Sequence, residues 1–194
     1  MDGHRFKQLT QMMDHGASRR RMAAGLMGAA LATLAVKRVG GESLARGESM
    51  TVSDEHDLEQ AIQRMRSATA EFMQGKPEAW KAMCSQRADA TLFGGWGGHE
   101  RGWEQLGPRY DWAAARYAGG EVTFEEFARF ATADLAHTVH LERSQARLVG
   151  VDESVPVALR VTHVYRREEG GWKLLHRHAD PLVAIQTTES VIEQ

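Results

Sequence analysis

The 194-residue chain has one cysteine, Cys84, no strong net charge, and no apolar run long enough to span a bilayer. A single cysteine excludes an intrachain disulfide and any metal site that needs several cysteines. The formal net charge of −2 provides no basic field of the kind that binds nucleic acid. We therefore expect small organic molecules and protein surfaces as partners, and no nucleic acid.

A nucleotide-binding motif is also missing. Five glycines lie in residues 94–102, together with Trp96 and His99. A phosphate-binding loop would need a lysine followed by serine or threonine, and none follows here. We expect no cofactor, and interpret this glycine-rich segment as a loop that could contribute Trp96 and His99 to the mouth of a ligand site.

The first 45 residues differ from the rest of the chain. Residues 18–22 (SRRRM) precede an alanine- and glycine-rich segment, 23–36, which as a helix would span about 22 Å. A bilayer core is about 30 Å thick, so a membrane anchor is not expected. Together with the small residues at 43–45, this order resembles a twin-arginine export signal. It predicts export through that machinery, or a cytoplasmic protein if Lys37 and Arg38 make the leader non-functional.

Residues 46–194 have the length of one domain. Apolar residues recur at helical spacing over 53–72, and shorter helices are expected near 77–85 and 103–117. From Glu121 onward strand patterns dominate, and a Gly-Gly turn at 170–171 predicts a hairpin. This order predicts an α+β domain with a curved antiparallel sheet around helices.

The final hairpin resembles a known family. Residues 158–167, the Gly-Gly turn and residues 171–178 (GWKLLHRH) resemble the last hairpin of SnoaL-like proteins in the nuclear transport factor 2-like superfamily. The loop 93–98 and residues 111–116 fit the same branch. The resemblance implies a cone with an interior pocket, usually dimeric. Members include ketosteroid isomerase, polyketide cyclases, dehydratases and non-catalytic binders, so the fold does not assign an activity.

His163 is expected to point into the pocket for two reasons. On its strand it alternates with the apolar Val161 and Leu159, whereas the arginines occupy the other face. The hairpin is also similar to that of the calcium/calmodulin-dependent kinase association domain, and a cavity arginine of that domain falls on His163. On the preceding strand the same rule places His137 on the apolar face and leaves His140 and Glu142 on the opposite face.

The last strand carries His176, His178 and Asp180 in strict alternation, so their side chains share one face. Its apolar pattern places Trp172 and the two histidines inward, whereas the kinase-domain resemblance places Arg177 inward. A β-bulge would reconcile these two assignments.

The candidate catalytic residues are therefore His163, His178 and Asp180. The candidate ligand contacts are Trp96, His99, His137, His163, His176 and Arg177. An imidazole with a pKa of about 6.5 can donate and accept protons at neutral pH. Asp180 could orient a histidine or act as a base. These groups would suit a lyase or isomerase acting by proton transfer, although the tyrosine and aspartate of ketosteroid isomerase cannot be matched.

Structural alternatives remain open for the same residues. His163 could be a hydrogen-bonded interior histidine, and Asp180 could form a salt bridge with Arg160 or Arg177. His176 and His178 could lie in a dimer contact. Three histidines and a carboxylate are also the residue types that bind a catalytic zinc ion. Such a site would require His163 to lie beside His176 and His178, and we predict no metal site.

The expected function is that of a homodimeric SnoaL-like protein that binds a small, partly apolar organic molecule in its interior pocket and acts there as a lyase or isomerase by histidine and aspartate proton transfer. The alternative is a non-catalytic dimerisation or interaction module of the same fold.

Overall fold

A computed structural model describes residues 50–187 of the chain. The expected leader, residues 1–45, lies outside the described residues, so export stays a prediction. Three helices and six strands are present between residues 50 and 187: α1 (Val52–Phe72), α2 (Glu78–Met83), α3 (Trp103–Ala114), β1 (Thr91–Phe93), β2 (His99–Arg101), β3 (Tyr117–Ala131), β4 (Leu135–Leu148), β5 (Val155–Glu168) and β6 (Gly171–Pro181).

The long helix α1 begins at a capping box. The Thr51 hydroxyl accepts the backbone N–H of Asp54 at 3.2 Å, and the Asp54 carboxylate accepts the backbone N–H of Thr51 at 3.0 Å. The apolar stripe of the helix, which includes Leu58, Ile62 and Met65, is buried in the core. The helix is present where this stripe predicts it, and it begins at Val52, one residue before the expected range 53–72.

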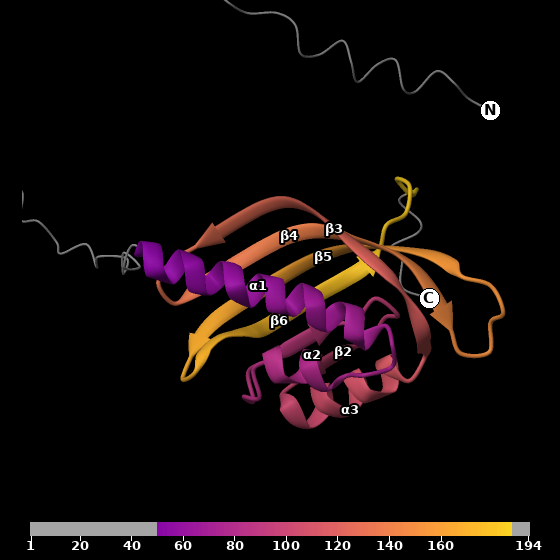
Figure 1. Cartoon of the computed structure of the whole chain (residues 1–194), viewed down its shortest axis with the longest axis horizontal. Helices are drawn as coiled ribbons and strands as arrows, with labels where there is room; N and C mark the ends of the chain where they lie inside the picture. The colour runs from indigo at the N-terminus through magenta and orange to yellow at the C-terminus, as the bar shows by residue number, and fades with distance from the viewer. Residues whose placement is uncertain (1–49, 188–194) are drawn as a thin grey trace, which may run out of the picture. The chain divides into compact units, whose positions relative to one another are not determined.

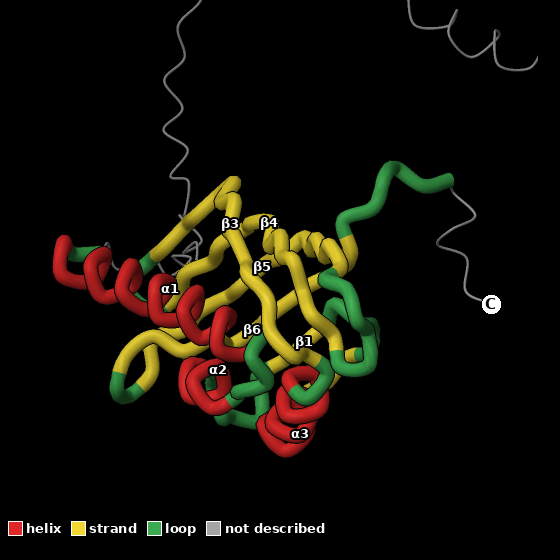
Figure 2. The backbone as a smooth tube through the Cα atoms, turned by 45° about the vertical axis from the view of Figure 1, so that its right-hand side comes forward, coloured by secondary structure: helices red, strands yellow, loops and turns green. Residues whose placement is uncertain are grey.

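The six strands form one open sheet in the order β2-β1-β6-β5-β4-β3. All neighbours are antiparallel except β1 and β6, and β3 to β6 form a meander. Figures 1 and 2 show the sheet curving around α1, with α2 and α3 side by side near the end of that helix. The predicted α+β class with a curved sheet is confirmed. We call the face that packs against α1 the inner face, and the opposite face the outer face.

A β-bulge in β6 decides which side chains reach the inner face. Tyr165 pairs with Leu174, but Val164 pairs with His176, so Leu175 is an extra residue. Leu174 is buried before the bulge and Arg177 is buried after it. The expected bulge is therefore present, and it places Arg177 inward.

Among residues 50–187, no helix combines the length and the apolar character that crossing a membrane requires.

Candidate functional site

A cavity of about 390 Å³ lies between the inner face of the sheet and the three helices. This volume is within the range of small-molecule sites, about 300 to 1,000 Å³. Its lining comes from segments far apart in the sequence, because the meander curves over α1 and the β1–β2 loop folds against α3. Most of the lining is apolar, and the charged side chains in it are Arg109, Glu142 and Arg177.

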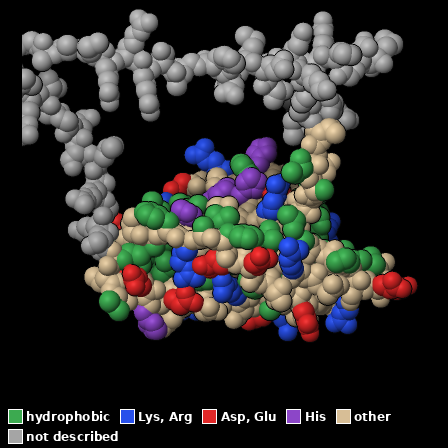
Figure 3. Space-filling model, turned by 90° about the horizontal axis from the view of Figure 1, so that it is seen from above, with side chains coloured by type: hydrophobic (Ala, Val, Ile, Leu, Met, Phe, Trp, Pro, Cys, Tyr) green, Lys and Arg blue, Asp and Glu red, His purple; other side chains and the backbone are tan. Residues whose placement is uncertain are grey.

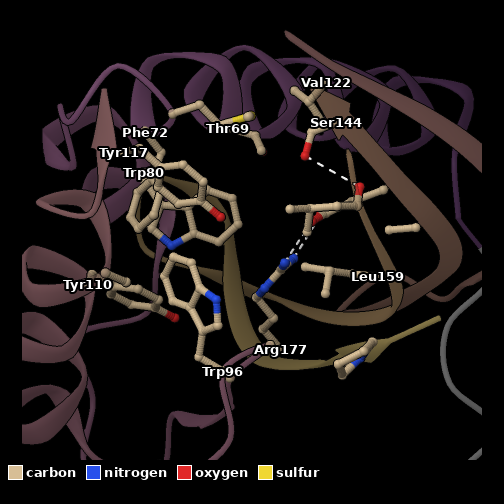
Figure 4. Close-up of a pocket in the computed structure, with 18 of the residues that line it drawn as sticks. Thr69, Phe72, Trp80, Trp96, Tyr110, Tyr117, Val122, Ser144, Leu159 and Arg177 are labelled. Carbon is tan, nitrogen blue, oxygen red and sulfur yellow. Dashed lines mark hydrogen bonds and ion pairs between the residues drawn. The ribbon is translucent and has the colours of Figure 1, made fainter. Parts of the chain in front are cut away.

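Five aromatic side chains form one wall of the cavity. They come from α1, α2, the β1–β2 loop, α3 and β3, and they are Phe72, Trp80, Trp96, Tyr110 and Tyr117. Neighbouring ring centroids lie 5.3 to 6.1 Å apart. Figure 4 shows these rings on one side of the cavity and Arg177 beside them, with its guanidinium directed toward its ion-pair partner. Such a wall suits a flat apolar or aromatic molecule.

Arg177 and Glu142 form a bidentate ion pair at the polar side of the cavity. Arg177 Nη1 donates to Glu142 Oε1 at 2.8 Å, and Nη2 donates to Oε2 at 2.7 Å. Both residues are at most 9% exposed. Burial alone would raise the pKa of Glu142, but the charge and the two hydrogen bonds of Arg177 more than offset burial and hold that pKa well below its usual range. Glu142 is therefore a carboxylate, and a weak base.

His163 lies behind this pair and does not line the cavity. Arg177 Nη1 lies 2.7 Å from His163 Nε2, and a guanidinium can only donate, so Nε2 accepts. The ring proton is then on Nδ1, which donates to the Tyr165 hydroxyl at 3.0 Å. Burial and the neighbouring Arg177 lower the pKa of His163 well below its usual value. His163 is thus buried, as expected, but it is neutral and fully hydrogen-bonded.

His140 completes the buried cluster from β4. Its Nε2 lies 3.3 Å from Glu142 Oε1, and its Nδ1 lies 3.5 Å from the Thr138 hydroxyl. Because the carboxylate accepts, Nε2 carries the proton. Ligand atoms of His140, Glu142 and His163 lie within 4.8 Å of one another, which would suit a metal ion in donor type. The guanidinium of Arg177 already bonds to two of these residues, so a metal ion would have to displace it.

The inner face of β4 corrects the assignment made from the sequence. Thr138, His140 and Glu142 are buried on this face, whereas His137 lies on the outer face and stacks on Phe130 at 5.8 Å. The expectation that the more apolar face of β4 points inward is wrong here, because the polar side chains on the inner face have partners on β5 and β6. Placing His137 in the pocket was therefore wrong.

His176, His178 and Asp180 share a face as expected, but after the bulge it is the outer face. His176 Nδ1 lies 2.7 Å from the Thr91 hydroxyl, and the His178 ring lies 5.2 Å from that of Phe93. Asp180 pairs with Arg160, one of the two alternatives considered above. This row therefore does not point inward. The sheet separates its side chains from His163, so these residues cannot join in one zinc site.

Trp96 and Arg177 are the two expected ligand contacts that line the cavity; His99 and His176 do not. The loop that carries Trp96 is held by Arg109, which donates to the Gly97 carbonyl at 2.8 Å and pairs with Glu100 at 3.3 Å. Sequence reasoning missed Glu142 as a cavity residue. The available signal was its alternation with His140, which predicts that the two share a face.

Neither a family model nor a curated protein matches the sequence. Solved structures do match the fold. A nuclear transport factor 2-like superfamily protein from Salmonella enterica serovar Typhimurium is 16% identical, with a TM-score of 0.61 over 72% of this chain and 99% of that one. A ketosteroid isomerase-like protein from Erwinia carotovora atroseptica is 15% identical, with a TM-score of 0.57 over 69% and 100%. A hexachlorocyclohexane dehydrochlorinase is 19% identical, with a TM-score of 0.56 over 73% and 100%.

Proposed function

Because the described part of the chain has the nuclear transport factor 2-like fold, a fold with many activities, we propose a function from the cavity itself. The protein binds a small, mainly aromatic organic molecule in this cavity, against the aromatic wall and beside Arg177, whose guanidinium carbon lies 5.3 Å from the centroid of the Trp80 ring. The observation that carries this proposal is the cavity of about 390 Å³ with five aromatic side chains on one wall and a buried ion pair beside them.

Binding is favoured over proton abstraction. His178 and Asp180 lie on the outer face, so they cannot reach a molecule in the cavity. The carboxylate that does line the cavity, Glu142, is paired with Arg177, and its lowered pKa makes it a poor general base. A lyase or isomerase that uses the His178 and Asp180 row is therefore not supported by this geometry.

The binding proposal can be tested with 2-naphthamide as a probe, followed by quenching of tryptophan fluorescence. Ser144 lines the cavity on β4, so Ser144→Phe should fill it and weaken binding at least about 10-fold, equivalent to about 1.4 kcal/mol. Gln145→Phe is the matched control, because the neighbouring side chain is exposed and does not line the cavity. Equal binding by both variants and the unchanged protein would contradict the proposal.

A second candidate, a dimerisation module, rests on the outer face of the sheet. Phe130 and Leu135, which flank the turn between β3 and β4, are 59% and 47% exposed, and the surface in Figure 3 shows histidines among hydrophobic and charged side chains. Contiguous exposed apolar groups are typical of protein interfaces. We propose a homodimer through this face. Light scattering should give a dimer mass that Phe130→Glu reduces to a monomer mass; a monomeric unchanged protein would contradict this candidate.

A further inference from the structure

The charged groups that line the cavity cancel in pairs. Arg177 is neutralised by Glu142, and Arg109 pairs with Glu100 beside the loop. The nearby His163 is neutral, as its accepted hydrogen bond from Arg177 requires. Burial raises the pKa of both tyrosines in the aromatic wall, so their hydroxyls are uncharged as well. A charged ligand would bring an unbalanced charge into this site, and burying such a charge is costly.

The ion pair still has hydrogen-bonding capacity on its cavity side. Three of the five N–H groups of Arg177 are used: two on Nη1, toward Glu142 and His163, and one on Nη2, toward Glu142. Among residues 50–187, its Nε–H and its second Nη2–H have no acceptor. Glu142 Oε1 accepts from Arg177 and His140, whereas Oε2 accepts only from Arg177 within the described part of the chain. Nη1 and Nη2 both point to Glu142, so the free Nη2–H lies beside Nε–H on the edge of the guanidinium that faces away from that carboxylate, and the two N–H groups form one fork of donors.

We infer that the cavity selects an uncharged aromatic ligand that carries a carbonyl oxygen as hydrogen-bond acceptor, as a carboxamide or a lactam does. The carbonyl oxygen of the ligand accepts from the free Nη2–H and Nε–H of Arg177. The ring then lies against the aromatic wall beside Arg177 in Figure 4. This inference rests on the proposed function and narrows it to a class of ligand.

Three matched probes test the ligand class on the full chain at pH 7: 2-naphthamide, 2-naphthoate and naphthalene. They share the same two rings and differ in charge and hydrogen-bonding groups. The expected order has naphthamide tightest, with naphthoate and naphthalene each at least about 10-fold weaker, measured by calorimetry or tryptophan quenching. Naphthoate loses affinity because its charge repels Glu142, and naphthalene because it leaves the two free N–H groups of Arg177 unpaired.

Glu142→Gln should reverse this selectivity. The variant keeps the shape of the side chain but leaves the charge of Arg177 unbalanced, so naphthoate should then bind more tightly than naphthamide. Asp180→Asn is the matched control, since it removes a carboxylate of the outer face and should preserve the original order. Thermal unfolding establishes that each variant is folded, and if Glu142→Gln does not fold, the order of the three probes on the unchanged protein decides.

The outcomes separate the two proposals. Tighter binding of naphthoate than of naphthamide to the unchanged protein, or an unchanged order in folded Glu142→Gln, would overturn the ligand class while the binding proposal stands. Failure of all three probes to bind would contradict the binding proposal and this inference with it.

Discussion

Arg177 on β6 and Glu142 on β4 reach each other across the intervening strand β5, with Nη2 and Oε2 2.7 Å apart. The β-bulge at Leu175 makes this contact possible, because it turns Arg177 to the inner face. The pair is buried, its hydrogen bonds extend to His163 and His140, and it forms the polar side of the cavity. The stability of the fold and the chemistry of the site therefore depend on the same two residues.

Arg177→Met should lower the free energy of unfolding by about 3 to 5 kcal/mol, because Glu142 would remain as a buried, unpaired charge. Urea denaturation measures this loss. The double variant Arg177→Met, Glu142→Met should lose less, since no charge is left uncompensated. A cost for the single variant no larger than that of the double variant would contradict the role assigned to the pair.

Acidification should weaken the same pair. The pKa of Glu142 is lowered in the fold, so its contribution to stability is complete above the ordinary pKa of 4.5 and is lost as pH falls below that value. The stability difference between the unchanged protein and Glu142→Gln should therefore shrink below pH 4.5. Other carboxylates titrate in both proteins and cancel in the difference. Denaturation curves between pH 6 and pH 3 would show a constant difference if Glu142 were not paired.

His163 should remain neutral in the folded protein under mildly acidic conditions. Its pKa is lowered in the fold, whereas an unfolded histidine takes up a proton below about pH 6.5. The contribution of His163 to stability is thus present above that pH and is lost as pH falls. Nitrogen NMR of labelled imidazoles should show the Nδ1–H tautomer from pH 8 to pH 5.5. A signal that titrates near pH 6.5 would contradict the hydrogen-bond assignment, and His163→Gln should remove this pH dependence of stability.

Gly120 should resist substitution at the start of β3. Its φ is +140°, and a Cβ atom there would lie 2.4 Å from the Gln145 carbonyl oxygen. Gly150 is the matched control, because its φ is also positive at +81° but no atom lies within 4 Å of the Cβ position. Gly120→Ala should therefore cost about 2 kcal/mol more stability than Gly150→Ala, measured by urea denaturation. Equal costs would indicate that β3 can shift away from β4.

Much of the fold could be predicted because it depends on local patterns. The stripe of Leu58, Ile62 and Met65 predicts α1, and the Gly-Gly turn predicts the last hairpin. The inward position of Arg177 was one of two assignments that the sequence left open, and the bulge in β6 is the feature that reconciles them. The candidate site was predicted less well, since only Trp96 and Arg177 of the proposed ligand contacts line the cavity.

The wrong assignment of the β4 faces has a physical cause. Apolar periodicity identifies the buried face of a strand only where that face carries apolar side chains. The inner face of β4 instead carries the polar residues His140 and Glu142. These groups can be buried because Arg177, distant in sequence, supplies charge and hydrogen bonds to Glu142. The sequence by itself determined the helices, the strands and the hairpin, since these follow from neighbouring residues. Only the tertiary structure decided which polar side chains meet inside the cavity, because that depends on strand register and on partners from different strands.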